Sequence, residues 1–169
     1  MRKISRLIAL AFVLFACVSC DQATKSVAQE HLSSTQPVVW LNGLVHLQVA
    51  ENPGAFLSLG AGLSTTAQYW LFTAMVAVIL TGFLVFVLKE SQKMHMTMLI
   101  GIALLLGGGL SNLIDRVVNG GRVVDFIVIG NSMLHTGIFN IADVAITTGV
   151  IIVAFYGFRE ARSARTANR

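Results

Sequence analysis

Hydrophobic residues gather in four long stretches of this chain, and polar segments separate them. The stretches cover residues 7–20, 65–88, 94–114 and 138–158. The second and third are long enough to cross the roughly 30 Å hydrocarbon core of a bilayer as helices, which takes about 20 residues. The fourth is interrupted by Asp143, and a carboxylate that faces lipid costs at least a few kcal/mol. We therefore expect Asp143 to face protein or water, which makes it a candidate functional residue.

The first stretch has two interpretations. It ends in LFACVSC at residues 14–20, and a cysteine after small residues also ends the signal peptide of a bacterial lipoprotein. However, Phe15 is bulky, and Cys17 stands where leucine is usual in such a signal. Three further hydrophobic stretches also favour retention. We expect a retained first span that extends toward Lys25, with Arg6 reaching the interface at its other end.

Composition supports a bilayer as the natural solvent. The chain has 169 residues, of which 55% are hydrophobic and 12% charged, and its mean hydropathy is +0.75. These values are abnormal for a soluble domain. We predict an all-α membrane fold, a single-domain bundle of four transmembrane helices with spans at about 4–24, 65–88, 94–116 and 137–158.

Charge placement predicts the orientation of the bundle. Nine of the twelve basic residues lie at the N-terminus, between the second and third spans, or in the C-terminal tail. With four spans these regions share one side, which the positive-inside rule makes the cytoplasm. Both termini are then cytoplasmic, and the loops of about 25–64 and 117–136 are extracytoplasmic. The basic residues flank spans without aromatic interleaving, so we expect contact with anionic lipid and no binding of nucleic acid.

The first extracytoplasmic loop has the pattern of β-structure. In PVVWLNGLVHLQV, residues 37–49, apolar runs flank Asn42-Gly43, a dipeptide that favours a type I′ hairpin turn. This predicts a small β-rich subdomain between the first and second helices, on the membrane surface. In the second loop, Asn119-Gly120-Gly121 precedes RVVDFIVI and predicts another short hairpin.

Polar side chains that could carry chemistry cluster at the outer ends of the spans. They are Asp21, Lys25, Glu51, Asn52, Asn112, Asp115, Arg116, Asp125, Asn140 and Asp143. On the third span, Asn112 and Arg116 are four residues apart and share a face. On the fourth, Asn140, Asp143 and Thr147 form one polar stripe.

Small residues on the third span predict close helix packing. Ala103, Gly107 and Ser111 recur at intervals of four, the spacing that lets membrane helices approach one another. Packing alone explains the stripe and the glycines at 107–109. The same packing brings Asn112 toward a neighbouring helix.

Asp125 and Asp143 form a candidate catalytic pair. They are too far apart in sequence to pair within one helix, so they meet only if the second loop folds Asp125 over Asp143. In a partly desolvated pocket, repulsion between two carboxylates lets the pair hold one proton. The ionised member then activates water, and the protonated member polarises the scissile carbonyl. From spacing alone, a structural role for Asp125 as a loop cap or an arginine partner is favoured over a catalytic one.

Other chemistries have weaker support. No metal site or cofactor is predicted, because the four histidines are scattered at 31, 46, 95 and 135 without a ligand spacing. Cys17 and Cys20 are a lone pair of cysteines inside an apolar stretch, where a packing role is expected. A Ser-Lys dyad with Lys25 as base remains an option, with candidate nucleophiles at Ser26, Ser58 and Ser111.

Five segments resemble motifs of the lipoprotein signal peptidases, or signal peptidase II, which are bacterial membrane aspartic proteases. The segments are DQATK at 21–25, ENPGAF at 51–56, GGGLSNLIDR at 107–116, VVDF at 123–126 and FNIAD at 139–143. They occur in the family's order across nearly the whole chain. Two departures are a loop at 51–56 that is one residue shorter than usual and Ser111 in place of glycine.

The resemblance implies a reaction and a location. The expected substrates are diacylglyceryl-prolipoproteins, whose signal peptide is cut immediately before the lipidated cysteine, with no cofactor, no metal and no obligate protein partner. The expected location is the bacterial cytoplasmic (inner) membrane, with the site on its extracytoplasmic side and membrane lipid around it. The alternatives are a small proton-coupled transporter or channel that uses Asp143, and a membrane-anchored scaffold protein.

The resemblance also implies a role for each matched residue. Asp125 and Asp143 are the expected catalytic dyad. The residues expected to bind substrate or support the site are Asn52, Gly54, Asn112, Arg116 and Asn140. The residues expected to give structural support are Asp21, Lys25 and Asp115.

Overall fold

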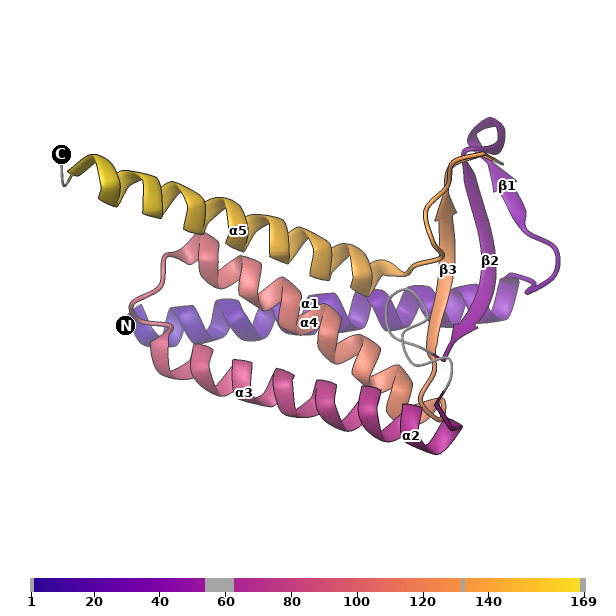
Figure 1. Ribbon diagram of the computed structural model, residues 1–169, viewed down its shortest axis with the longest axis horizontal. Helices are drawn as coiled ribbons and strands as arrows, with labels where there is room; N and C mark the ends of the chain where they lie inside the picture. Colours follow the sequence, from indigo (N-terminus) through magenta and orange to yellow (C-terminus); the bar gives the residue numbers. More distant parts are fainter. Residues whose placement is uncertain (1, 54–62, 132, 168–169) are drawn as a thin grey trace.

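Four long helices run alongside one another, and a small sheet crosses one end of them (Figure 1). The computed structural model describes residues 2–53, 63–131 and 133–167. The long helices are α1 (Arg2–His31), α3 (Met75–Glu90), α4 (Met96–Val118) and α5 (Ile141–Ala167). The short helix α2 (Thr65–Tyr69) continues into α3 through a π-helical turn at Trp70–Ala74. Both chain ends lie at the opposite end of the molecule from the sheet.

These helices are long and apolar enough to cross a membrane. The candidate spans are Lys3–His31, Trp70–Glu90, Met96–Val118 and Ile141–Ser163. The four-helix prediction is therefore confirmed, although two helices differ in extent from the predicted spans. The first helix continues to His31 instead of ending near residue 24, and the last begins at Ile141 instead of 137.

The helix α4 lies at the centre of the bundle, because three consecutive glycines face three different helices. A Cβ atom added at Gly107 would lie 2.7 Å from the Cys17 side chain of α1, and one added at Gly108 would lie 2.4 Å from the Ala142 carbonyl oxygen of α5. A Cβ atom at Gly109 would lie 2.7 Å from the Leu80 side chain of α3. The predicted close packing of this segment is confirmed.

The bundle has an apolar interior and an apolar exterior. Its buried cluster consists of Leu10, Val87, Leu99, Ile102, Ala103 and Leu106. Large apolar side chains on the outer faces of the helices are exposed, as expected for groups that contact lipid; they include Phe12, Phe15, Val78, Ile151 and Phe155. At the end away from the sheet, Arg6 donates to the Ser91 carbonyl and, at 2.5 Å, to the Met94 carbonyl, tying α1 to the α3–α4 turn.

The sheet combines strands from both loops. Its strands are β1 (Val38–Trp40), β2 (Val45–Asn52) and β3 (Val123–Ile129), arranged antiparallel in the order β1-β2-β3. The β1–β2 turn confirms the Asn42-Gly43 prediction: both residues have positive φ, 55° and 89°, and the Leu44 N–H donates to the Leu41 carbonyl at 3.2 Å. The subdomain is therefore not confined to the first loop, because β3 belongs to the second.

The second predicted hairpin turn is wrong in position. Asn119 and the two glycines after it end α4, where the Gly121 N–H donates to the Arg116 carbonyl at 2.7 Å. The chain instead turns back after β3, where bridges pair Gly130 with His135 and Ile127 with Phe139. This return delivers residues 139 and 140 to the start of α5, beside the strand that carries Asp125.

Candidate active site

Asp143 lies in the first turn of α5, where Asn140 caps the helix. The Asn140 Oδ1 atom accepts from the Asp143 N–H at 2.9 Å, and the Asp143 Oδ2 atom accepts from the Asn140 N–H at 3.1 Å. This reciprocal pair is a capping box. The positive end of the helix dipole also favours a negative charge at this position. Asn140 is thus the cap of the helix, and the predicted stripe that placed it within the fourth helix is corrected.

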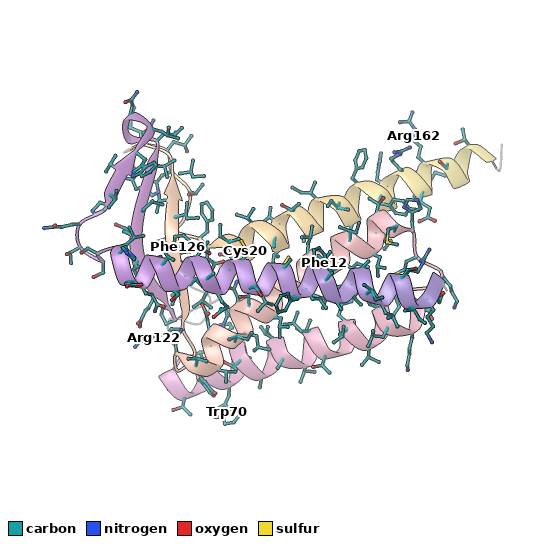
Figure 2. The ribbon with its side chains drawn as sticks, turned by 180° about the vertical axis from the view of Figure 1, so that it is seen from behind. Phe12, Cys20, Trp70, Arg122, Phe126 and Arg162 are labelled. Carbon is teal, nitrogen blue, oxygen red and sulfur yellow. The ribbon has the colours of Figure 1, made fainter. Side chains whose placement is uncertain are left out.

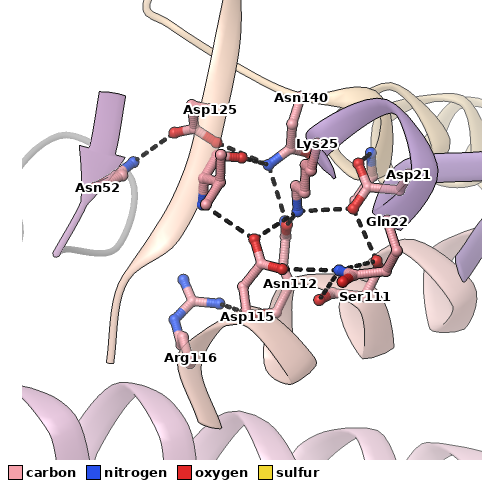
Figure 3. A network of polar contacts seen from close by, with 12 residues as sticks. Asp21, Gln22, Lys25, Asn52, Ser111, Asn112, Asp115, Arg116, Asp125 and Asn140 are labelled. Carbon is pink, nitrogen blue, oxygen red and sulfur yellow. Dashed lines mark hydrogen bonds and ion pairs between the residues drawn. The ribbon is translucent and has the colours of Figure 1, made fainter. Parts of the chain in front are cut away.

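Asp125 lies on β3 and is only 2% exposed. Its Oδ1 atom accepts from Asn140 Nδ2 at 2.7 Å, and its Oδ2 atom accepts from Asn52 Nδ2 at 3.1 Å. Pairing of β2 with β3 brings Asn52 there, since Asn52 lies opposite Val123. Figure 3 shows Asp125 between these two amides.

The pKa of Asp125 is raised from 3.8 to about 6, chiefly because burial disfavours the charged form. The neighbouring Asp143 carboxylate contributes to this rise, because two negative charges repel. The hydrogen bonds from Asn52 and Asn140, and the charge of Lys25, act in the opposite direction. Asp125 is thus a carboxyl group that holds its proton at a higher pH than an ordinary aspartate does.

Two amide side chains join the aspartates. Asn112 on α4 donates from Nδ2 to Asp143 Oδ1 at 2.9 Å. Its Oδ1 atom accepts from Asn140 Nδ2 at 3.1 Å, and Asn140 in turn donates to Asp125. The structure therefore brings Asp125, Asp143, Asn112, Asn140 and Asn52 into one hydrogen-bonded group at the end of the bundle that carries the sheet.

A buried ion cluster lies directly behind this group. Lys25 Nζ is 2.7 Å from Asp21 Oδ2 and 2.8 Å from Asp115 Oδ2, and it donates to Asn112 Oδ1 at 3.0 Å. Figure 3 shows the lysine at the centre of these contacts. Asp21 and Lys25 meet because α1 extends beyond its apolar stretch, which places residues 21 and 25 on one face of the helix.

The two aspartates of the ion cluster also hold backbone N–H groups of other elements. Asp21 Oδ1 accepts from the Ala142 N–H of α5 at 2.7 Å, and Asp115 Oδ2 accepts from the Val124 N–H of β3 at 3.0 Å. The cluster therefore ties α1 and α4 to the elements that carry Asp125 and Asp143. Its position agrees with the structural support expected of Asp21, Lys25 and Asp115.

Sequence reasoning missed two residues of the cluster. Gln22 donates to Asp115 Oδ1 at 2.7 Å and to Ser111 Oγ at 3.0 Å. Ser111 Oγ donates to Asp21 Oδ2 at 2.7 Å, so this serine is a hydrogen-bond partner in addition to a small packing residue. The glutamine beside Asp21 in DQATK, together with a serine on the helix face of Asp115, was the signal that could have identified both.

Arg116 has spare hydrogen-bonding capacity beside the aspartates. Its Nη1 atom donates to the Asn112 carbonyl at 3.2 Å, while its buried Nε atom has no partner in the part of the chain that the structure describes. Its positive charge interacts with Asp143, Asp125 and Asp115. Gly54, also expected at the site, lies outside the described residues.

The site and the basic tail occupy opposite ends of the molecule. Figure 2 shows Arg122 and Phe126 near the sheet and Arg162 near the far end of α5. Within the described part of the chain, no group of three or more histidine, cysteine or acidic side chains is arranged to hold a metal ion. The polar groups gathered near the sheet include carboxylates, which can act as general acids and bases, together with amides and cations that can orient them.

Comparison with known proteins decides the family. The sequence model of the family described as signal peptidase (SPase) II matches residues 13–159. The chain belongs to the signal peptidase II family. The lipoprotein signal peptidase of Pseudomonas paraeruginosa is 39% identical over 160 residues, which cover 94% of this chain and 89% of that protein. The lipoprotein signal peptidase of Pseudomonas syringae pv. tomato is 37% identical over 155 residues, 89% of this chain and 86% of that protein.

Solved structures agree with this assignment. A bacterial membrane enzyme solved at 2.3 Å is similar with a TM-score of 0.75 and 28% identity, covering 93% of this chain and 89% of the other. Membership in the signal peptidase II family confirms the resemblance and makes the chain a protease, so the transporter and scaffold alternatives are set aside. The four spans and these similar structures make it a multi-pass bacterial membrane protein.

Proposed function

We propose that this protein removes the signal peptide from diacylglyceryl-modified prolipoproteins, cutting immediately before the lipidated cysteine. The observation that carries the proposal is the joined pair Asp125 and Asp143, which share the amides of Asn112 and Asn140 at one end of a membrane bundle. Support for the substrate class comes from relatives named lipoprotein signal peptidase. The two aspartates act as a dyad that activates water.

The two carboxyl groups have different environments and therefore different tasks. Asp143, which lies in the first turn of α5 and forms the capping box with Asn140, is the ionised member that takes a proton from the attacking water. Asp125, with its pKa raised to about 6, is the protonated member that donates to the scissile carbonyl oxygen. Water adds to the carbonyl carbon, and the tetrahedral intermediate then collapses. The leaving amine takes the proton from Asp143, and the intermediate returns the other proton to Asp125, which restores the dyad.

The remaining site residues hold substrate or orient the dyad. Arg116 is suited to a substrate carbonyl, because its buried Nε–H has no hydrogen-bond partner among the described residues. Asn112 and Asn140 keep both aspartates in place through the contacts described above. Asn52 supports Asp125 through its hydrogen bond, and Gly54 is assigned with it to substrate binding or site support. Asp21, Lys25 and Asp115 take no part in proton transfer.

The architecture suits a lipid-modified substrate. The dyad lies at the sheet end of the spans, because Asp125 is on β3 and Asp143 is in the first turn of α5. A scissile bond next to a diacylglyceryl cysteine can therefore stay at the membrane surface while its acyl chains remain in lipid. The basic residues near both termini support a cytoplasmic location for the opposite end of the bundle. The site then faces the extracytoplasmic side of the bacterial inner membrane.

The proposal predicts that cleavage depends on the lipid. The purified chain in phospholipid vesicles is given one prolipoprotein with a diacylglyceryl cysteine and the same prolipoprotein without it. Mass spectrometry is expected to find a product that begins with the diacylglyceryl cysteine, and cleavage of the unmodified protein is expected to be slower by at least about 100-fold, because remote binding energy is lost. Equal cleavage of both substrates, or a cut elsewhere in the chain, would contradict the proposed substrate.

A further inference from the structure

Lys25 is the most deeply buried cation near the dyad among the described residues, and the proposed proton transfers do not use it. It is 2% exposed, and it contacts neither Asp125 nor Asp143 through a hydrogen bond. We propose that Lys25 is a positioning residue, whose ammonium fixes the direction in which the Asn112 and Asn140 amides point and so presents an NH2 donor to each aspartate of the dyad. This inference rests on the proposed function.

Lys25 determines which way the Asn112 amide points. An ammonium has three N–H donors and no acceptor. Those donors meet Asp21 Oδ2 at 2.7 Å, Asp115 Oδ2 at 2.8 Å and Asn112 Oδ1 at 3.0 Å. An amide NH2 group facing Lys25 would set donor against donor, so Asn112 must turn its oxygen toward the lysine. Its Nδ2 atom is then left to face Asp143 Oδ1, where it donates at 2.9 Å.

The orientation of the Asn112 amide in turn determines that of the Asn140 amide. The Asn112 oxygen that faces Lys25 also accepts from Asn140 Nδ2 at 3.1 Å. Asn140 must therefore point its NH2 group toward Asn112 and Asp125, and its oxygen toward the Asp143 N–H. One cation thus sets the direction of both amides. Reversing Asn112 would place its oxygen against the Asp143 carboxylate and remove a donor from that site.

The position of Lys25 is in turn fixed by anchored carboxylates. Asp21 also holds the Ala142 N–H and the Ser111 hydroxyl, and Asp115 also holds the Val124 N–H. The lysine is therefore held in a fixed position relative to the backbone segments that carry Asp143 and Asp125. A rigid supporting shell of this kind keeps catalytic groups in a productive geometry.

The test requires a variant that keeps the charge of the cluster. Loss of Lys25 alone would leave two buried carboxylates without their cation, which is strongly destabilising and can by itself prevent folding. Lys25→Met combined with Asp21→Asn removes one positive and one negative charge together. Asp21→Asn alone keeps the ammonium on Asn112 and is the matched comparison, and Lys93→Met changes an exposed lysine paired with Glu90.

We expect the double variant to lose kcat by about 100-fold with little change in KM, since small displacements of catalytic groups cost that much. Asp21→Asn alone is expected to lose less kcat than the double variant, because it keeps the ammonium beside Asn112, and Lys93→Met is expected to keep the wild-type kcat. All rates are measured on diacylglyceryl-prolipoprotein in vesicles and divided by the amount of folded protein. A purely structural role for Lys25 predicts less folded protein with an unchanged kcat.

Asn112→Asp is a second variant that keeps Lys25 fully paired. A carboxylate at this position still accepts from Lys25 and Asn140 but cannot donate to Asp143, so we expect a comparable loss of kcat. If wild type and Lys93→Met cleave while the double variant or Asn112→Asp matches their kcat, the positioning role is overturned. If wild type itself fails to cleave, the failure belongs to the proposed function instead.

Discussion

Asp125 and Asp143 have the same side chain but different surroundings in this protein. Asp125 is buried on a strand and accepts from two amide side chains. Asp143 is half-buried in the first turn of a helix and accepts from a backbone N–H and one amide. Environments that separate the proton affinities of two neighbouring acids are those that assign one as acid and the other as base.

The raised pKa of Asp125 leads to a prediction about pH. The folded chain binds this proton more tightly than the unfolded chain, so the associated stability is fully present below pH 3.8 and is lost as pH rises through about 6. Because the dyad needs one proton, kcat is expected to fall as Asp125 loses it. Asn52 lowers this pKa by hydrogen bonding, so Asn52→Leu is expected to move the decline of kcat to higher pH.

The measurement is a pH profile of kcat for wild type, Asn52→Leu and Gln48→Leu. Gln48 lies on the same strand but lines a separate cavity with His46 and Val128, so its replacement is expected to leave the profile in place. A decline at lower pH in Asn52→Leu would contradict the role assigned to the Asn52 amide.

Individual residues of the site were predictable to different degrees. Asp143 stood out because a carboxylate inside an apolar span needs a partner or water. Asp125 did not, since spacing alone left a structural role open and only the motif resemblance singled it out. Gln22 and the hydrogen-bonding role of Ser111 were missed because their bond joins α1 to α4, and spacing along the chain does not show which residues of two distant segments meet.

At the scale of elements, α4 is the helix on which the site depends. Its glycines let α1, α3 and α5 approach, and the next turns carry Asn112 and Asp115 toward those neighbours. The contact at Gly108 is the tightest of the three glycine contacts, because the neighbouring atom is the Ala142 carbonyl oxygen of the backbone. A backbone atom cannot rotate away as a side chain can.

We therefore expect Gly108→Ala to push α4 and α5 apart. The predicted loss of unfolding free energy is about 1–3 kcal/mol, the usual cost of overpacking, with a loss of cleavage because Asn112 separates from Asp143. Thermal unfolding in detergent and the vesicle assay measure the two effects. Gly82→Ala on α3 is the matched control, since a Cβ atom there meets nothing within 4 Å. Similar losses of stability and cleavage in Gly108→Ala and Gly82→Ala would contradict the close contact of Gly108 with α5.

Secondary structure followed the sequence where local signals were strong. The apolar stretches became helices, and Asn42-Gly43 became the tight turn of a hairpin. The first helix ran longer than predicted because residues 21–31 contain neither glycine nor proline, and because its polar extension buries Asp21 and Lys25. The turn signal at 119–121 was misread because glycine after a helix serves equally well to end it.

At the scale of the whole molecule, the sheet joins parts of the chain that sequence patterns treat separately. Strand β3 from the second loop pairs with β2 from the first, in addition to its bridge to the segment that follows it. This pairing delivers Asn52 to Asp125, and the return after β3 delivers Asn140 to both aspartates. The sequence could show that each loop contains a strand, but pairing between loops depends on how the spans pack.

The bundle, the sheet and the ion cluster all converge on the joined aspartates. The most direct test of the account therefore measures single-turnover cleavage of diacylglyceryl-prolipoprotein in vesicles by Asp125→Asn and Asp143→Asn. Glu160→Gln, which neutralises an exposed carboxylate near the far end of α5, is the control. We predict that each dyad variant inserts and folds but cleaves at least about 1,000-fold more slowly than wild type, while the control keeps the wild-type rate. Cleavage at the wild-type rate by either folded dyad variant would contradict the account.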